Sequence, residues 1–220
     1  MKDNLFWVDC EMTGLEPDTC VIIEIASIVT DSELNVLAEG PAIVIQHPQS
    51  ELDKMDAWNQ KHHRASGLYD KVLASTVALR EAEVQTLAFA KQFGGVRKMP
   101  LCGNSIWQDR RFLAKQMPEL EQFLHYRIVD VSSFKEVVKR WYPSGITPTK
   151  KKEAHRALDD IRESIFELQF YRKHYMIAPE LAPKTQADLE AKDATAKDAT
   201  VKDATVKDAT VKDAQVPPVL

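Results

Sequence analysis

The sequence predicts an α/β domain in which a mixed β-sheet begins with an antiparallel meander and is flanked by helices. Short turns join the β-prone runs of the first 46 residues, and such turns are typical of antiparallel neighbours. Apolar residues at helical spacing predominate after these runs. The predicted strands cover residues 5–9, 20–30, 34–37, 41–46, 99–103 and 127–131. The predicted helices cover residues 53–68, 76–93, 106–116, 132–141 and 153–175.

The first predicted strand ends in two carboxylates that share one face. Side chains alternate along a strand, so Asp9 and Glu11 project from the same side, about 7 Å apart, and Cys10 points into the core. Adjacent anions repel each other, and their oxygens suit a divalent cation such as Mg²⁺ or Mn²⁺. The alternative is that the strand simply ends in a solvated loop at Asp9.

The next two runs contain polar interruptions. Glu24 is the one carboxylate in the apolar run at 20–30, and we expect it to be a paired structural residue near the site rather than a metal ligand. Glu39-Gly40-Pro41 predicts a break that leaves two short strands, at 34–37 and 41–46, because glycine and proline interrupt regular structure.

Asp109 lies on the apolar face of its predicted helix. It is three or four residues from Ile106, Phe112 and Leu113, so the four side chains form one stripe. An inward-facing carboxylate is costly unless a cation or a set of donors satisfies it. An ion pair with an arginine is the simplest alternative, but the adjacent arginines do not share this face, because neighbours on a helix point in different directions.

The last predicted helix carries a pair of aspartates. Asp160 falls at the edge of the apolar arc and Asp159 on the polar side, so Asp160 is the one able to face the sheet. His155 lies five residues before Asp160, roughly 140° around a helix. It can share a site with Asp160 only from the preceding loop or first turn, where it would suit proton transfer. Otherwise it is a surface histidine.

Composition indicates a reduced, non-membrane protein. The chain has 220 residues, 44% of them hydrophobic, and a net charge of −4, which does not predict a long nucleic-acid track. Cys10, Cys20 and Cys102 have no metal-type spacing, and we expect free thiols in a cytoplasmic protein. Neither a signal peptide nor an apolar run long enough to span a bilayer is expected.

The C-terminal segment differs from the rest of the chain. Lys-Asp-Ala-Thr recurs with a period of five from residue 192 to 210, which matches neither a helix nor a strand, and aromatic residues are absent. Such a segment cannot bury enough apolar surface to order itself. We therefore expect residues 1–183 to form the catalytic domain and residues 184–220 to be a disordered tail without a catalytic role.

Carboxylates from three separate elements are thus predicted to face inward or to end a strand. They are Asp9, Glu11, Asp109 and Asp160. Acids gathered in this way are typical of two hard cations about 3.5–4 Å apart, which activate water and stabilise the leaving oxygen of a phosphoryl displacement. His155 would be the general base that takes the proton from water.

The residues around these acids form recognisable motifs. They are D-x-E-M-T-G-L at 9–15, I-I-E-I-A at 22–26, G-N-S at 103–105, Q-D-R-R-F-L at 108–113 and H-x-A-x-D-D-I-R-E-S at 155–164. Together they resemble oligoribonuclease, in the histidine-bearing branch of the DEDD 3′→5′ exonucleases. The resemblance covers essentially residues 4–176 and implies a ribonuclease-H-like exonuclease fold.

The resemblance implies an activity and its cofactors. The activity is hydrolysis of very short RNA, especially dinucleotides, to 5′-mononucleotides by a homodimer. Two divalent cations, Mg²⁺ or Mn²⁺, would be held by Asp9, Glu11, Asp109 and Asp160, with His155 as the base. The mild acidity of the chain fits a short ligand, because few phosphates need few cations.

The same resemblance assigns substrate contacts. Leu15 and Trp58 would contact the bases, whereas the residues alone favour Trp58 as a core plug in a polar helix. A pocket closed at the 5′ phosphate would favour dinucleotides, since a longer strand has no room beyond it. The remaining implied contacts are His63, Ser105 and Gln108 in the pocket, Arg127 and Ser132 at the 5′ phosphate, and Tyr126 with Arg127 near the dimer interface.

Two alternatives remain open. A proofreading or tRNA-trimming exonuclease of the same superfamily would share the acids but not the surroundings of Trp58 and the His-Tyr-Arg sequence at 125–127. A catalytically silent nucleic-acid-binding module is the other, although all five site residues are present. Cys10 and Trp107 depart from the family pattern, and both are expected to point away from the metals.

Overall fold

The computed structural model describes residues 3–148, 156–178, 181–186 and 188–189. His155 and the repeat that begins at Lys192 lie outside the described residues. None of the helices within these ranges combines the length and the hydropathy that a bilayer crossing requires.

The chain divides into two units, Met1–Tyr175 and Met176–Leu220. In the described part of the second unit, Asp188 accepts hydrogen bonds from the backbone nitrogens of Lys184 and Thr185 at 3.0 and 2.9 Å. These contacts are local to the sequence. The predicted disorder of residues 184–220 concerns mainly residues outside the description and stays a prediction.

The first unit is built on a five-stranded sheet with the order β3-β2-β1-β4-β5. Strands β1, β2 and β3 pair antiparallel, and β4 and β5 continue the sheet in parallel with β1. The prediction of a mixed sheet that begins with an antiparallel meander is therefore confirmed. The strands are β1 Leu5–Met12, β2 Ile22–Thr30, β3 Val36–Val44, β4 Pro100–Gly103 and β5 His125–Asp130.

The predicted break at residues 39–41 is wrong, because β3 is one continuous strand through Gly40 and Pro41. β3 lies at the edge of the sheet, where a proline that lacks an N–H is tolerated. The pairing of β3 with β2 is irregular opposite Gly40 and Pro41, where the register shifts between Ala26 and Ile28 of β2.

The predicted helix at 53–68 is replaced by shorter helices. Asp56 caps α2 by accepting the backbone N–H of Asn59 at 2.7 Å, and Gly67, with a left-handed φ of 70°, is the cap residue directly before α3. Helices α1, α3 and α6 were not predicted. The helices are α1 Gln49–Leu52, α2 Ala57–Ala65, α3 Leu68–Ala74, α4 Leu79–Phe93, α5 Ile106–Gln116, α6 Pro118–Phe123, α7 Val131–Trp141 and α8 Ala157–Tyr175.

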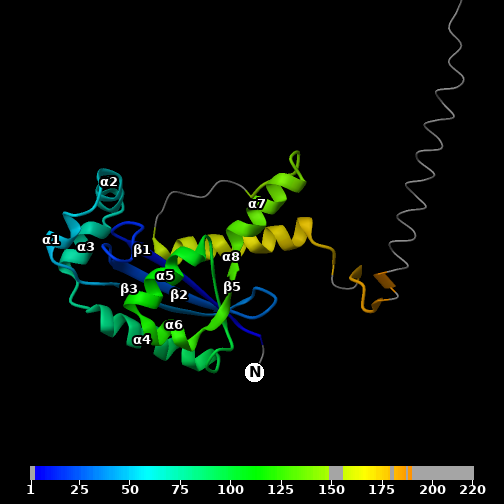
Figure 1. The fold of residues 1–220 in the computed structure, drawn as a ribbon, viewed down its shortest axis with the longest axis horizontal. Helices are drawn as coiled ribbons and strands as arrows, with labels where there is room; N and C mark the ends of the chain where they lie inside the picture. The colour runs from blue at the N-terminus through cyan, green and yellow to red at the C-terminus, as the bar shows by residue number, and fades with distance from the viewer. Residues whose placement is uncertain (1–2, 149–155, 179–180, 187, 190–220) are drawn as a thin grey trace, which may run out of the picture. The chain divides into compact units, whose positions relative to one another are not determined.

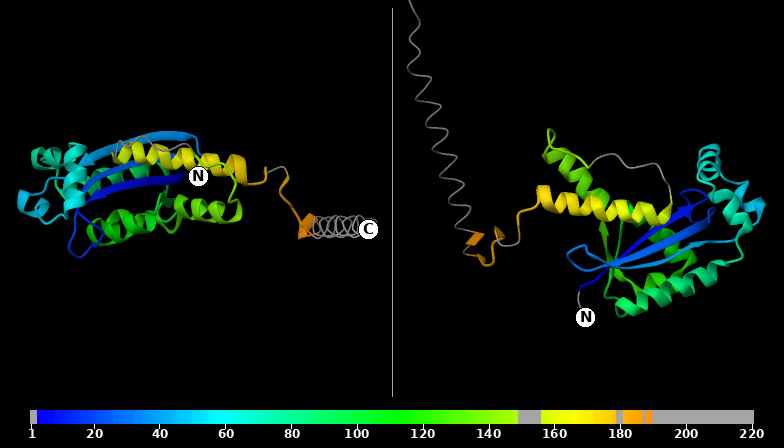
Figure 2. Two further views of the ribbon diagram at one scale, coloured as in Figure 1. Left: turned by 90° about the horizontal axis from the view of Figure 1, so that it is seen from above. Right: turned by 180° about the vertical axis from the view of Figure 1, so that it is seen from behind.

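Helices cover both faces of the sheet. α4, α5 and α6 pack on one face, and α8 lies across the other together with α7 (Figures 1 and 2). Strand β1 serves both layers, since Phe6, Val8 and Cys10 pack towards α5 whereas Trp7 packs towards α8. This alternation confirms that Cys10 points into the core and away from Asp9 and Glu11, which share the α8 face with Trp7. On its own side, the Cys10 side chain contacts Asp109.

Candidate active site

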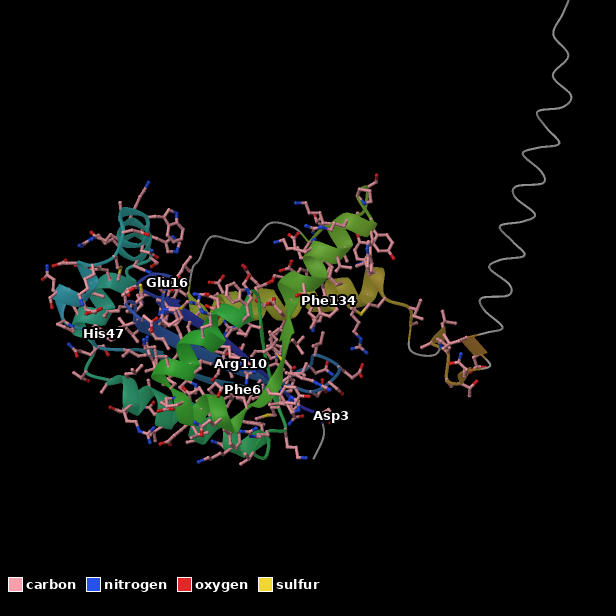
Figure 3. The ribbon with its side chains drawn as sticks, viewed as in Figure 1. Asp3, Phe6, Glu16, His47, Arg110 and Phe134 are labelled. Atoms are coloured by element: carbon pink, nitrogen blue, oxygen red, sulfur yellow. The ribbon has the colours of Figure 1, made fainter. Side chains whose placement is uncertain are left out.

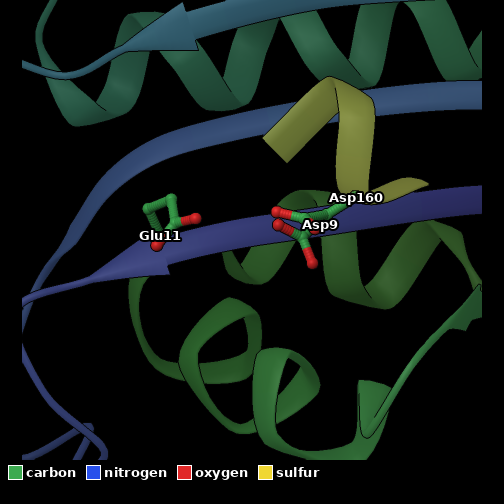
Figure 4. Close-up of side chains that lie close together, drawn as sticks. All are labelled: Asp9, Glu11 and Asp160. Atoms are coloured by element: carbon green, nitrogen blue, oxygen red, sulfur yellow. The ribbon is translucent and has the colours of Figure 1, made fainter. Parts of the chain in front are cut away.

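Three carboxylates meet on the α8 face of the sheet. Oxygen atoms of Asp9 and Glu11, both on β1, and of Asp160, on α8, lie within 4.8 Å of one another (Figure 4). All three side chains are partly accessible to solvent. The arrangement has the oxygen donors that a divalent cation requires.

The first turn of α8 directs Asp160 towards the strand. The carbonyl oxygen of Arg156 accepts the backbone N–H groups of Asp159 and Asp160 at 2.9 and 3.1 Å. Asp159 points elsewhere and pairs with Arg162 at 2.7 Å. The prediction that Asp160, and not Asp159, faces the sheet is confirmed.

Glu24 lies beside the three carboxylates without joining them. It is opposite Glu11 in the β1–β2 pairing and is only 1% exposed. Arg156 donates two hydrogen bonds to its Oε1, from Nε at 3.2 Å and from Nη2 at 2.6 Å, and Nε also lies 3.2 Å from Oε2. The expectation that Glu24 is a paired structural carboxylate is therefore confirmed.

The electrostatics of the cluster favour a bound cation. Burial, reinforced by the charges of Asp160 and Glu24, raises the pKa of the Glu11 carboxyl to about 8. The charge of Asp109 raises the same pKa further, and that of Arg156 lowers it. A carboxylate held in this state gains stability when a positive ion binds beside it, which is the behaviour of a metal ligand.

Asp109 reaches β1 from α5, whose apolar side chains pack on the face of the sheet opposite α8. It is 7% exposed, and its Oδ1 accepts the backbone N–H of Cys10 at 2.9 Å. Burial raises the pKa of the Asp109 carboxyl. The predicted alternative, an ion pair with an adjacent arginine, is not formed: Arg110, labelled in Figure 3, bonds to Glu121 at 2.6 Å, and Arg111 bonds to Gln108 at 2.9 Å. Asp109 is thus buried as predicted, next to the strand but outside the group of three carboxylates.

His63, on α2, is buried next to the end of β1 and close to Glu11. Its Nε2 is 3.0 Å from the carbonyl oxygen of Met12, and its Nδ1 is 4.0 Å from Glu11 Oε2. Burial lowers the pKa of His63, which favours a neutral ring with its proton on Nε2. Nδ1 makes no hydrogen bond within the described residues and remains available as an acceptor.

Two further predicted substrate contacts, Ser105 and Ser132, lie side by side where α5 and α7 begin. Ser105 has a left-handed φ of 50°, a strained conformation for a residue other than glycine. Asp130 accepts the backbone N–H groups of both Ser105 and Ser132 at 3.0 Å. The sequence analysis missed Asp130 because it fell inside the predicted strand at 127–131. Asp130 caps α7, which begins one residue earlier than predicted, and a carboxylate at that position is a signal for a helix cap.

The predicted base contacts are exposed. Leu15 is 69% exposed, and its carbonyl accepts a hydrogen bond from Gln108 Nε2 at 2.5 Å. Trp58 is 67% exposed and stacks on His62, with ring centroids 4.7 Å apart and planes 9° from parallel. The interpretation of Trp58 as a core plug, drawn from the residues alone, is therefore wrong.

The His-Tyr-Arg sequence also presents an open aromatic ring. Tyr126 is exposed and stacks on His125, with ring centroids 4.5 Å apart. The guanidinium of Arg127 lies 5.4 Å from the centroid of the Tyr126 ring. These side chains are thus free to contact a ligand or a partner surface.

Comparison with known proteins assigns the chain to a family. The exonuclease family model RNase_T matches residues 6–168. Oligoribonuclease of Pseudomonas syringae pv. tomato is 56% identical over 175 residues, which cover 80% of this chain and 97% of that protein. Oligoribonuclease of Vibrio cholerae is 59% identical over 170 residues, with 77% and 94% covered.

Solved structures show the same fold at low sequence identity. Exonuclease I of E. coli in complex with a dT13 oligonucleotide superimposes with a TM-score of 0.59 and 16% identity, over 78% of this chain and 41% of that one. A zinc-bound form of the same enzyme with single-stranded DNA gives 0.56 and 16%, over 79% and 41%. These two matches show the fold alone, whereas the family model and the two curated relatives give the assignment. The chain belongs to the oligoribonuclease family of exonucleases.

Proposed function

We propose that this chain is a 3′→5′ exoribonuclease that hydrolyses very short RNA, dinucleotides above all, to 5′-mononucleotides. The observation that carries the proposal is the convergence of Asp9, Glu11 and Asp160 within 4.8 Å. Membership of the oligoribonuclease family supports the substrate class. An exposed indole at Trp58 supports binding of an unpaired base, because bases stack on aromatic rings.

Two divalent cations, Mg²⁺ or Mn²⁺, are the proposed cofactors. Asp9, Glu11 and Asp160 would hold them, with Asp109 completing the set from α5, beside the Cys10 backbone. When bound, such cations acidify water and neutralise the charge that develops on the phosphate oxygens. The raised pKa of Glu11 supports this assignment, because burial first and the neighbouring carboxylates second disfavour its charged form, and a bound cation would offset both.

His155 is the proposed general base. It would take a proton from water, whose oxygen attacks the phosphorus of the scissile phosphodiester. The bond from phosphorus to the 3′ oxygen then breaks, and that oxygen takes up a proton from solvent. The products are a 5′-mononucleotide and the remaining 5′ nucleotide with a free 3′ hydroxyl.

The proposed substrate contacts are those that a dinucleotide requires, with one side chain for each base and a cation for the 5′ phosphate. Leu15 and Trp58 would contact the two bases, and Arg127 would bind the 5′ phosphate. Their support is exposure of the first two side chains and the positive charge of the third. The other proposed contacts are His63, Ser105 and Gln108 in the pocket, Ser132 at the 5′ phosphate and Tyr126 near the dimer interface.

The enzyme is proposed to act in the cytoplasm as a homodimer. The exposed Tyr126 ring is compatible with a role near a subunit interface. Sedimentation equilibrium of the full chain tests this assembly. A mass of a single chain across the micromolar range would contradict it.

Substrate competition tests the activity. A 5′-phosphorylated RNA dinucleotide and a long single-stranded DNA, each labelled at its 5′ end, are incubated with the enzyme and Mn²⁺. We expect the dinucleotide to be converted to mononucleotides at least about 100-fold faster. Comparable rates on the two substrates would contradict the proposed substrate class and favour a proofreading-type exonuclease.

A further inference from the structure

A buried ion pair joins the strand beside the acidic cluster to the beginning of α8. Glu24 is a cross-strand neighbour of Glu11, so the two side chains leave the sheet on the same face. Its carboxylate is almost entirely buried, and the guanidinium of Arg156 binds both of its oxygens within 3.2 Å. A buried carboxylate of this kind depends on its cationic partner.

Arg156 also makes the backbone contacts that begin α8. Its carbonyl oxygen accepts the N–H groups of Asp159 and Asp160. One residue therefore connects Glu24, through its side chain, to Asp160, through its main chain. The connection is short, so movement of Arg156 would move the carboxylate of Asp160.

Apolar packing alone does not fix the position of α8 this closely. Ala157 and Ile161 pack against Trp7 and Ala26 of the sheet. Such contacts are not directional, and they would tolerate rotation or sliding of the helix over a flat apolar surface. A rotation by one residue, about 100°, would turn Asp160 away from Asp9. Hydrogen bonds from Gln169 and Arg172 to loop residues after β2 orient the far end of α8, and the two-point bonding of Arg156 with Glu24 supplies direction at its first turn.

We propose that Glu24 and Arg156 are positioning residues for metal binding. They hold the first turn of α8 so that Asp160 faces Asp9 and Glu11, and they keep the Arg156 guanidinium occupied. Without Glu24, the guanidinium would be attracted to Glu11, whose charge already acts on it, and would compete there with a cation. Their role depends on the metal site proposed above.

The chain contains a matched control on the same helix. Arg162 binds both oxygens of Glu39 on β3, at 3.0 and 2.7 Å, six residues after Arg156. The distances in this pair match those between Arg156 and Glu24. However, the Arg162 and Glu39 side chains are 46% and 43% exposed, whereas Glu24 is buried. Exposed pairs contribute little to stability, so loss of this one should leave Asp160 in place.

The test measures Mn²⁺ binding to the full-length, metal-free protein by isothermal titration calorimetry. Residues that orient metal ligands typically change affinity by about 10–100-fold, and we expect Glu24→Gln to weaken Mn²⁺ binding by at least about 10-fold. Arg156→Lys retains the positive charge but loses the planar guanidinium that bonds to both oxygens of Glu24, and it should weaken Mn²⁺ binding about fivefold. Arg162→Gln should stay within about twofold of the wild type.

Thermal melting of the metal-free variants separates positioning from stability, because a purely structural role would lower the melting temperature without changing the Mn²⁺ affinity of the folded protein. Binding within about twofold of wild type in folded Glu24→Gln would overturn the role. Equal weakening in Arg162→Gln would also overturn it. Should Glu24→Gln not fold, Arg156→Lys decides by the same twofold limit.

Asp160→Asn distinguishes failure of this role from failure of the metal site. If the wild type binds Mn²⁺ and Asp160→Asn does not, the site stands, and only the Glu24 and Arg156 variants decide the role of the pair. If Asp160→Asn binds Mn²⁺ as the wild type does, the proposed site is wrong and the positioning role falls with it.

Discussion

Asp160 and Asp109 reach the same strand from helices in opposite layers, and their surroundings differ. Asp160 joins Asp9 and Glu11 on the α8 face, where all three carboxylates retain contact with solvent. Asp109, on α5, is buried and accepts the backbone N–H of Cys10. The Asp109 carboxylate has one oxygen committed to a buried backbone donor, whereas the Asp160 carboxylate lies partly exposed beside two other acids.

The difference indicates that the two aspartates contribute unequally to binding and to stability. Loss of Asp160 should affect metal binding and leave the fold intact. Loss of Asp109 should affect both, since its Oδ1 satisfies a buried N–H group.

The largest expected effect is that of Asp160→Asn on activity. Removing one carboxylate from the cluster should reduce turnover of an RNA dinucleotide at least about 1,000-fold, because several kcal/mol of charge stabilisation depend on the cations. The melting temperature of the metal-free protein should not fall. Rates are measured by chromatography of the mononucleotide product at saturating Mn²⁺, and retention of a tenth of wild-type activity would contradict the assignment.

Trp58→Ala should weaken substrate binding without affecting the metal site, in contrast to the substitution of Asp160. Base stacking on an aromatic ring is worth about 1–3 kcal/mol, so we expect KM for the dinucleotide to rise about 5- to 150-fold with the Mn²⁺ affinity unchanged. The control is Trp141→Ala, which removes a similarly exposed indole from the end of α7. Equal KM values for the two variants would indicate that Trp58 does not contact a base.

Substitutions at Asp109 test its dual role. Asp109→Asn keeps an oxygen that can accept the Cys10 N–H, whereas Asp109→Ala leaves that donor unsatisfied at a cost of about 1–3 kcal/mol. The asparagine variant should therefore melt about 2–10 °C above the alanine variant, and both should lose activity. Differential scanning calorimetry of the two metal-free variants measures this difference. Coincident melting curves would show that the hydrogen bond from the Cys10 N–H does not stabilise the fold.

The smallest expected effect is the pH dependence caused by Glu11. Its pKa is raised from 4.5 to about 8 in the folded protein, so the folded state holds this proton more tightly than the unfolded chain does. The associated stability is complete below pH about 4.5 and is lost as the pH rises through about 8. Metal-free Glu11→Gln cannot ionise and should melt at least about 3 °C above wild type at pH 8, with a smaller difference at pH 5. A difference independent of pH would contradict the raised pKa.

Local periodicity was sufficient to predict how the acids face. Asp9 and Glu11 share a face because a strand alternates, and Asp109 is buried because it lies on the apolar stripe of α5. The same reasoning distinguished Asp160 from Asp159. These predictions needed only the residues of a single element.

Contacts between distant elements could not be predicted in this way. Glu24 was expected to have a partner, but Arg156 is 132 residues away, and only the packing of α8 on the sheet brings them together. The exposure of Trp58 likewise depends on where α2 lies relative to the core. The edge position of β3, which tolerates Pro41, is also a property of the sheet rather than of the run itself.

Anomalous diffraction from crystals soaked in Mn²⁺ tests the carboxylate site most directly. We expect a strong peak bonded to oxygens of Asp9, Glu11 and Asp160 at about 2.1 Å, with a second peak where Asp109 can reach it. A well-ordered crystal in saturating Mn²⁺ that showed no peak among these three side chains, or a peak at another site alone, would contradict metal-dependent hydrolysis at this site.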